Sequence, residues 1–292
     1  MKVLLLLVAI LALVWRPGDA SAPRDGLLQE HVRIFSLDGR YTLAATIVRP
    51  NGPGPYGAIV LNHGLPLTAG ERRLESPEQL RDAAALLAQR GYAVIMPVRR
   101  GFGATGGWFA EDAGSCSAPD YRRGEAAAAE DIMAAYRFAR RLPYVDRSRM
   151  ILAGQSAGGV ASLYTAAEYA PEGLVAVLAF AAGRGGDPVA HPGVPCAVEP
   201  LAKVFADLGA RVKAPVLFHY AENDLFFNTQ TSRLWFQRFS GAGARAEYVL
   251  QPPVGANGHF VFSEAGAPYW VPAVERFLRK YGVPFGALSE RT

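Results

Sequence analysis

The chain has 292 residues, half of them hydrophobic, with 30 Lys and Arg residues against 26 Asp and Glu and a net charge of +4. This size suits one α/β domain with a buried core. No basic run and no basic stripe interleaved with aromatic residues stands out, so the sequence gives no support for a nucleic-acid partner.

The first segment, residues 1–20, has the features of a secretory signal peptide. Lys2 precedes an apolar run from Val3 to Trp15, and small residues lie near Ala20, as a signal peptidase requires. The run is shorter than the roughly 20 residues of a bilayer-spanning helix. We therefore expect cleavage after Ala20, no membrane span in the mature chain, and a secreted or periplasmic location. An uncleaved N-terminal anchor is the alternative.

The remaining residues, 21–292, are expected to form a single domain in which strands and helices alternate. Two leading strands flank the turn signal Asp38-Gly39. Short, fully apolar runs beyond them predict strands buried on both faces of a mostly parallel sheet. The expected strands are His31–Leu37, Tyr41–Val48, Ala58–Asn62, Tyr92–Val98, Met150–Ala153, Leu174–Ala181, Pro215–Tyr220 and Ala246–Leu250. The expected helices are Ser76–Arg90, Arg122–Arg141, Ala157–Tyr169, Thr229–Phe239 and Pro268–Tyr281.

A serine-centred pentapeptide, residues 154–158 (GQSAG), lies between the predicted strand Met150–Ala153 and a helical pattern of small residues. A G-x-S-x-G turn between a strand and a helix is typical of a nucleophile elbow, in which the glycines make room for a strained serine. We expect Ser156 to present its hydroxyl at the N-terminus of the helix, where free amides favour negative charge. A purely structural glycine-rich turn is the alternative.

One histidine stands where the general base of such a site belongs, because the expected chain order is serine, acid, histidine. His259 follows the last predicted strand in a glycine-bordered loop, so we expect it to be the base. The other four histidines are less suitable. His31 and His63 precede Ser156, His191 lies in a Pro/Gly connection, and His219 lies within a predicted strand. A surface-loop role for His259 is the alternative.

Two carboxylates, Glu222 and Asp224, follow the strand predicted at Pro215–Tyr220. We favour Asp224 as the acid, because the later position lets the strand end before the side chain turns toward His259. Glu222 is the rival. Both could instead cap the helix that begins near Asn228.

Two backbone amides are candidates for an oxyanion hole. The amide of Ala157 directly follows the serine, and that of Leu65 lies in the loop after the third predicted strand. Pro66 cannot donate a hydrogen bond. His63 in the same loop is expected to be structural, with its imidazole bonded to nearby backbone.

These motifs resemble the α/β-hydrolase superfamily and, within it, the secreted relatives of dienelactone hydrolase and of the prolyl-oligopeptidase-type hydrolase domain. The resemblance runs from about Tyr41 to Tyr281 and rests on His63-Gly64, Arg100-Gly101-Phe102-Gly103, Gly154–Gly158, Asp224 and His259. It implies an α/β-hydrolase fold with a mostly parallel eight-stranded sheet, helices on both faces and a small lid insertion. Dienelactone hydrolases proper carry a cysteine nucleophile, so Ser156 favours a serine esterase. The residues before Tyr41 are too few for the propeller of a prolyl-oligopeptidase-type peptidase.

The expected activity is that of a secreted serine hydrolase, most directly a carboxylic ester hydrolase that forms an acyl-enzyme on Ser156 and takes a small-molecule ester. A peptidase or amidase with the same residues and a catalytically silent binding protein are the alternatives. No zinc motif is present, so no metal is expected. Residues 101–106 match G-x-G-x-x-G, but the sequence after them does not favour a phosphate-facing helix, and no cofactor is expected.

Two loops are expected to lie over the serine. The segment at about 183–212 is long enough for a small lid. Phe102, Trp108 and Phe109 are candidates for lining a substrate pocket, and packing the loop down is the alternative role. We also expect a disulfide between Cys116 and Cys196, because they are the chain's two cysteines, the compartment is oxidising, and both follow strands that end over the same face. Two free thiols are the alternative.

Overall fold

A central sheet organises the computed structural model, which describes residues 21–24 and 26–286; the signal peptide expected at 1–20 lies outside them. The strands are β1 (Ser21–Arg24), β2 (Leu27–Phe35), β3 (Thr42–Pro50), β4 (Tyr56–Asn62), β5 (Tyr92–Pro97), β6 (Val145–Gln155), β7 (Leu174–Phe180), β8 (Val216–Ala221) and β9 (Ala246–Gln251). Their order in the sheet is β1-β2-β3-β5-β4-β6-β7-β8-β9. The first three strands pair antiparallel, and β3 is antiparallel to β5. The six strands β4 to β9 are parallel to one another.

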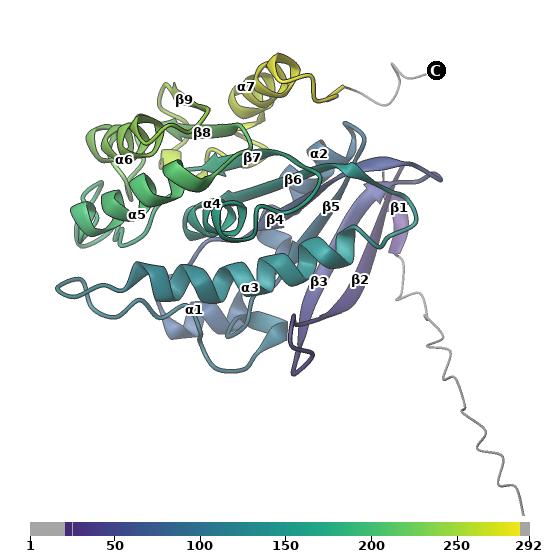
Figure 1. Cartoon of the computed structure of the whole chain (residues 1–292), viewed down its shortest axis with the longest axis horizontal. Coiled ribbons are helices and arrows are strands. Elements are labelled where there is room, and N and C mark those ends of the chain that lie inside the picture. Colours follow the sequence, from purple (N-terminus) through teal and green to yellow (C-terminus); the bar gives the residue numbers. More distant parts are fainter. Residues whose placement is uncertain (1–20, 25, 287–292) are drawn as a thin grey trace, which may run out of the picture.

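Helices cover both faces of this sheet (Figure 1). The α-helices are α1 (Ala69–Leu74), α2 (Arg81–Ala88), α3 (Tyr121–Ala139), α4 (Ala157–Tyr169), α5 (Val198–Arg211), α6 (Thr229–Gly241) and α7 (Ala267–Lys280). Short 3-10 turns are η1 (Pro77–Leu80), η2 (Gly103–Thr105) and η3 (Gly258–Phe260). The core on one face includes side chains of α3, α4, α5 and α6, and the core on the other includes those of α2 and α7. The expected mostly parallel sheet with helices on both faces is confirmed.

Three differences from the sequence prediction have local causes. The sheet has nine strands rather than eight within the described residues, because the short strand β1 pairs with β2. The helix α1 was not expected, since it buries no side chain and is marked only by a Thr68/Glu71 capping box. The strand β6 begins at Val145 rather than Met150, because residues 146–149 are partly or fully exposed and give no apolar signal.

The central strands are buried on both sides because their sequences are almost wholly apolar. Every residue of β5 is buried, and so are all residues of β4 except Tyr56. On one face Phe180 stacks on Phe262 with ring centroids 3.9 Å apart. On the other, Phe205 stacks on Trp235 at 5.6 Å. These layers make the sheet a rigid base for the loops that leave its strands.

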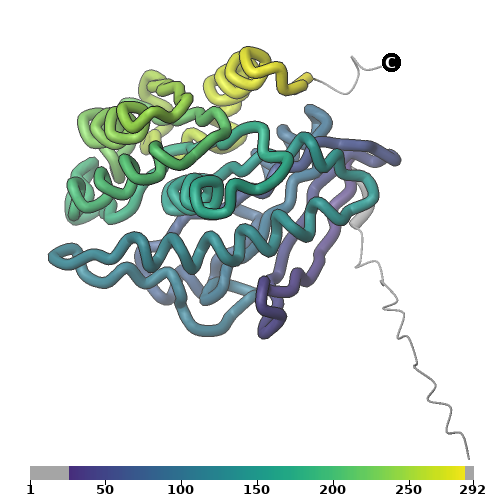
Figure 2. Tube along the Cα trace, viewed as in Figure 1, coloured from purple at the N-terminus to yellow at the C-terminus, as the bar shows by residue number. Residues whose placement is uncertain are grey.

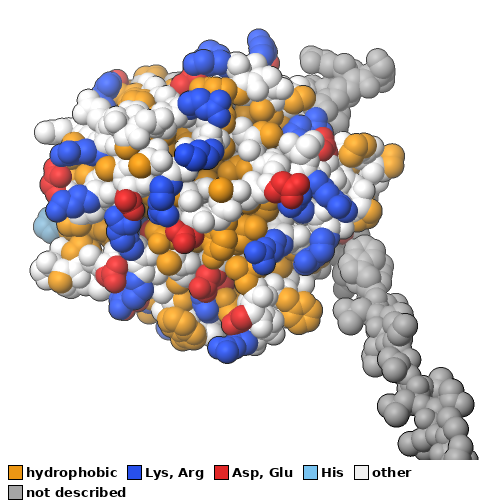
Figure 3. All heavy atoms as spheres, viewed as in Figure 1, with side chains coloured by type: hydrophobic (Ala, Val, Ile, Leu, Met, Phe, Trp, Pro, Cys, Tyr) orange, Lys and Arg blue, Asp and Glu red, His pale blue; other side chains and the backbone are white. Residues whose placement is uncertain are grey.

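The carboxyl ends of β4 to β8 meet at one edge of the sheet, where a ligand site is expected in an α/β fold. In Figure 2 the purple N-terminal strands and the yellow-green C-terminal elements lie at opposite ends of the sheet. Charged side chains of both signs are scattered among apolar ones over the face seen in Figure 3. No helix in residues 21–24 and 26–286 is long and apolar enough to cross a membrane.

Candidate active site

Ser156 lies at a strained turn between β6 and α4. Its backbone has φ 56° and ψ −125°, a conformation that costs free energy in a residue with a side chain. A Cβ at Gly154 would lie 2.3 Å from the Gly158 carbonyl oxygen, and one at Gly158 would lie 2.3 Å from the Asn62 and His63 oxygens. Only glycine fits at these two positions, so the G-x-S-x-G spacing follows from the packing of β6, α4 and β4.

Asp224 and His259 form a buried pair, each with 3% of its surface exposed. Nδ1 of His259 lies 3.0 Å from Oδ2 and 3.1 Å from Oδ1 of Asp224. The backbone amides of Phe226 and Phe227 donate to the same carboxylate, at 2.7 and 3.0 Å. These bonds hold the carboxylate in place and leave Nε2 as the histidine nitrogen that Asp224 does not contact.

The loop that carries His259 is tied to the serine turn. Gln155, directly before Ser156, donates from Nε2 to the His259 carbonyl at 2.8 Å. Asn257 accepts the His259 amide at 3.0 Å, and the imidazole stacks on Phe226 with ring centroids 4.0 Å apart. Sequence patterns did not identify Gln155, Asn257 or Phe226, because their roles depend on contacts between separate loops.

Glu222, the rival carboxylate, has an exposed side chain. The strand β8 ends at Ala221, so Glu222 still follows the edge of the sheet, and its amide bonds Gln251 at 3.0 Å. Asp224 is the carboxylate that contacts the imidazole of His259. The later of the two acidic positions is therefore the one that the structure brings to the histidine.

The two amides expected to face an oxyanion, those of Leu65 and Ala157, belong to residues that border one cavity together with Ser156. Neither amide donates a hydrogen bond to another group in the described part of the chain. A Cβ at Gly64 would lie 3.3 Å from Cβ of Ser156, so this loop passes close to the serine. His63, as expected, bonds backbone: its Nδ1 lies 2.8 Å from the Gly64 oxygen.

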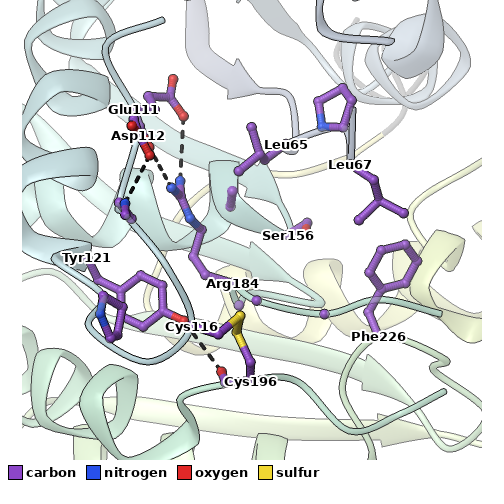
Figure 4. Close-up of a pocket in the computed structure, with 18 of the residues that line it drawn as sticks. Leu65, Leu67, Glu111, Asp112, Cys116, Tyr121, Ser156, Arg184, Cys196 and Phe226 are labelled. Carbon is purple, nitrogen blue, oxygen red and sulfur yellow. Dashed lines mark hydrogen bonds and ion pairs between the residues drawn. A yellow bond between two sulfur atoms is a disulfide. The ribbon is translucent and has the colours of Figure 1, made fainter. Parts of the chain in front are cut away.

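A buried ion network lies behind the loop that carries Leu65. Arg99 donates to both carboxylate oxygens of Glu111, at 2.5 and 3.2 Å. Arg184 lies 3.1 Å from Glu125 and 3.6 Å from Glu111, and its Nη2 donates to the Glu111 carbonyl at 2.8 Å. Burial raises the pKa of Glu125 to about 7 against the opposing effect of Arg184. Figure 4 shows Arg184 directed toward Glu111.

A disulfide joins Cys116 to Cys196, as predicted, with a Cα–Cα distance of 5.6 Å. The bridge links the loop after β5 to the loop after β7, and both cysteines border the same cavity as Ser156 (Figure 4). Residues 183–197 of the expected lid segment lie here, whereas the rest of that segment forms α5, which packs into the core through Leu201 and Phe205.

Two cavities meet at Ser156. The first, which we call the braced pocket, has a volume of about 210 Å³ and is bordered by Ser156, Leu65, Ala157, Tyr121, Arg184 and the Cys116–Cys196 bridge. The second, which we call the apolar groove, has a volume of about 350 Å³ and is bordered by Ser156, His259, Leu67, Leu74, Phe260 and Glu75. Of the three aromatic residues expected near the substrate, Phe109 borders the braced pocket, whereas Phe102 is buried against His63 and Trp108 is exposed.

No group of three or more His, Cys, Asp or Glu side chains that could hold a metal ion occurs among residues 21–24 and 26–286. The site consists of a serine in a strained turn, a buried Asp–His pair, two amides that donate to no other group among the described residues, and two cavities. This arrangement has the chemical parts for acyl transfer: a hydroxyl nucleophile, a base with an orienting carboxylate, and donors for negative charge.

Comparisons with known proteins agree with this description. Residues 78–181 match the model of the prolyl oligopeptidase family. Solved structures share the fold at low identity. A protein named as a dienelactone hydrolase from Klebsiella pneumoniae is 20% identical, with a TM-score of 0.60 over 88% of this chain and 99% of that one. An esterase from Pyrococcus furiosus is 14% identical, with a TM-score of 0.59 over 86% of this chain and 90% of that one. A longer protein named as a dipeptidyl aminopeptidase IV from Bacteroides ovatus is 18% identical, with a TM-score of 0.64 over 86% of this chain and 35% of its own length. No curated protein matches the chain.

The fold is that of an α/β hydrolase, as the sequence motifs indicated. The family match and these neighbours together indicate a hydrolase of the esterase or peptidase type.

Proposed function

We propose that the protein is a serine carboxylic ester hydrolase in which Ser156 is the nucleophile, His259 the general base and Asp224 the residue that orients the base. The observation that carries the proposal is the buried Asp224–His259 pair, whose histidine borders the same groove as a serine held in a strained turn. An Asp that accepts the Nδ1 proton leaves Nε2 free to accept the hydroxyl proton.

The reaction proceeds in two halves. Oγ of Ser156 bonds the ester carbonyl carbon while its proton passes to Nε2 of His259, and the carbonyl oxygen becomes an oxyanion that faces the Leu65 and Ala157 amides. The bond from carbon to the alcohol oxygen breaks, and the leaving alkoxide takes the proton from His259. Water then attacks the acyl-enzyme by the same steps, which releases the carboxylic acid and restores Ser156.

The two cavities suggest where each half of the ester lies. His259 must protonate the leaving group, and it borders the apolar groove but not the braced pocket. We therefore place the alcohol part in the groove and the acyl part in the braced pocket. Exposed Leu67, Leu74 and Phe260 along the groove favour an apolar alcohol.

A serine peptidase or amidase with the same residues is the second candidate, favoured by the family match over residues 78–181. The proposal of an ester hydrolase has separate support. The dienelactone hydrolase and esterase neighbours correspond to this chain over 99% and 90% of their length, whereas the peptidase neighbour does so over 35%. A catalytically silent binding protein with this fold remains the third candidate.

Secretion to an extracellular or periplasmic compartment is part of the proposal. The apolar segment at residues 1–20 and the Cys116–Cys196 bridge support it, because disulfides persist in oxidising compartments.

A matched pair of substrates tests the proposed activity. The purified protein is given an aryl ester and the anilide of the same acyl group, and kcat/KM is measured for each. We expect the ester to be preferred. Higher kcat/KM for the anilide would move the assignment to an amidase, and no turnover of either, together with no labelling by a fluorophosphonate, would favour the binding protein.

A further inference from the structure

The peptide group between Gly64 and Leu65 is held from one side by two donors. The Gly64 carbonyl oxygen lies 2.8 Å from Nδ1 of His63, and Nη2 of Arg99 donates to it at 3.3 Å. A second nitrogen of Arg99, Nη1, donates to the preceding carbonyl, that of His63, at 2.8 Å. The carbonyl and the amide of a trans peptide point in opposite directions. Bonds that hold the Gly64 oxygen therefore also fix the direction of the Leu65 amide.

The loop that carries that amide passes close to Ser156. A Cβ built on Gly64 would come within 3.9 Å of the serine Oγ, and Leu65 and Ser156 border the braced pocket together. The Leu65 amide donates to no other group in the described part of the chain. Two held carbonyls thus lie on the Arg99 side of the loop, and a free amide remains for the serine side.

We propose that His63 and Arg99 are positioning residues that hold the Leu65 amide toward the oxyanion formed at Ser156. The inference rests on the proposed ester hydrolysis, and it assigns to both side chains a role in the reaction that neither would have as a mere core residue.

The surroundings of His63 favour this role. The Arg99 amide donates to Nε2 of His63 at 3.1 Å, so the ring proton sits on Nδ1, where it can be donated to the Gly64 oxygen. Burial and the neighbouring Arg99 guanidinium hold the pKa of His63 well below its usual range, which keeps the ring neutral. A neutral ring with one donor and one acceptor satisfies both contacts at once.

Arg99 is itself fixed. It is fully buried, and the carboxylate of Glu111 accepts from its Nε and its Nη2. Glu111 in turn contacts Arg184, which lies in the loop that the disulfide ties to the Glu111 loop. Donors that need not reorganise during the reaction stabilise a developing charge best. The network therefore keeps the amide in its working direction before the substrate arrives.

The test uses Arg99→Lys and His63→Gln in the full mature protein, with Arg100→Lys as the matched control, because Arg100 pairs with Glu130 away from the serine. Lysine keeps the charge beside Glu111 but cannot hold the carboxylate and two carbonyls together. For each variant one measures kcat, KM and the melting temperature. Two inhibition constants are also measured: that of an aryl trifluoromethyl ketone, which forms a tetrahedral oxyanion adduct with serine, and that of the product alcohol.

We expect kcat and the ketone affinity to fall in parallel by about 10- to 100-fold, below the ~10²–10³-fold that loss of a whole donor costs. KM, the alcohol affinity and all values of Arg100→Lys should stay within about 2-fold. Unchanged kcat and ketone affinity in folded variants would overturn the inference, as would an equal loss of affinity for ketone and alcohol. A wild-type protein that neither hydrolyses esters nor binds the ketone would instead reject the proposed function itself.

Discussion

The braced pocket and the apolar groove lie on either side of Ser156 but are built differently. Behind the braced pocket, Arg99, Glu111, Arg184 and Glu125 are at most 4% exposed and contact one another. Along the apolar groove, Leu67, Leu74 and Phe260 are 48, 79 and 55% exposed. One side is fixed by buried charges and a disulfide, whereas the wall of the other is formed largely by exposed apolar side chains.

This difference matches the needs of the two sides. In the proposed mechanism, charge develops at the oxyanion beside the braced pocket, and rigid donors are most effective there. The alcohol differs from substrate to substrate, and an open apolar wall can accept several shapes. The comparison predicts that changes on the braced side alter kcat, whereas changes along the groove alter the choice of alcohol.

The largest effect is expected where the two cavities meet. Ser156→Ala should lower kcat by about 10⁴-fold or more, because the nucleophile is lost while the cavities remain. Turnover is measured with an aryl ester, and circular dichroism checks the fold. Ser148→Ala, at an exposed serine remote from both cavities, is the control. Wild-type turnover in Ser156→Ala would contradict the mechanism on both sides at once.

The next effect concerns Asp224, the residue proposed to orient the base. Asp224→Asn should lower kcat by up to about 10⁴-fold, because an amide favours the wrong tautomer of His259. Glu222→Gln is the matched control and should behave like the wild type, since Glu222 is exposed and lies outside the contact with His259. A ranking of kcat in the opposite order would move the acid to Glu222.

The principal residues of the site could be predicted from the sequence because each has a local signal. Ser156 is marked by its two glycines, and His259 and Asp224 by their order after the strands β8 and β9. The ion network could not be predicted, because Arg99 and Glu111 lie in the connection after β5 and Arg184 in the one after β7, and their roles depend on contacts between these side chains. The same holds for Gln155, whose bond to the His259 carbonyl joins two distant segments.

In the fold, the missed elements are those with weak periodicity. The helix α1 has no buried face, and its one signal, the Thr68/Glu71 capping box, is short. The first residues of β6 lack the alternation of apolar and polar side chains that would indicate a strand. Most apolar strands and long amphipathic helices were found because burial determines their sequence, whereas the residues of α5 were assigned to the expected lid.

Removing the disulfide should lower the stability of the whole domain. The bridge closes a loop of 80 residues, so chain-entropy reasoning gives a loss of about 4 kcal/mol in the free energy of unfolding when both cysteines become serine. Calorimetry of Cys116→Ser/Cys196→Ser measures the loss, and reduced wild-type protein should show the same shift. An unchanged melting temperature would mean that the bridge does not stabilise the folded domain.

The smallest effect is expected from the buried carboxyl of the groove. Burial raises the pKa of Glu75 to about 7, so the folded chain holds a proton that the unfolded chain releases near its ordinary pKa. The stability that this proton contributes is present below the unfolded pKa and is lost as the pH rises through about 7. Glu75→Gln should remove this slope, at most about 1.4 kcal/mol per pH unit. Urea unfolding from pH 4 to 8 measures it, and equal slopes in variant and wild type would contradict the account.

The central claim is that Ser156 forms a covalent acyl intermediate at the junction of the two cavities. The most direct measurement is peptide mass spectrometry after labelling the purified wild-type protein with an aryl fluorophosphonate, with and without excess ester. The account predicts one adduct, on Ser156, whose formation the ester slows. An adduct on another residue, or none on Ser156 in a folded protein, would contradict it.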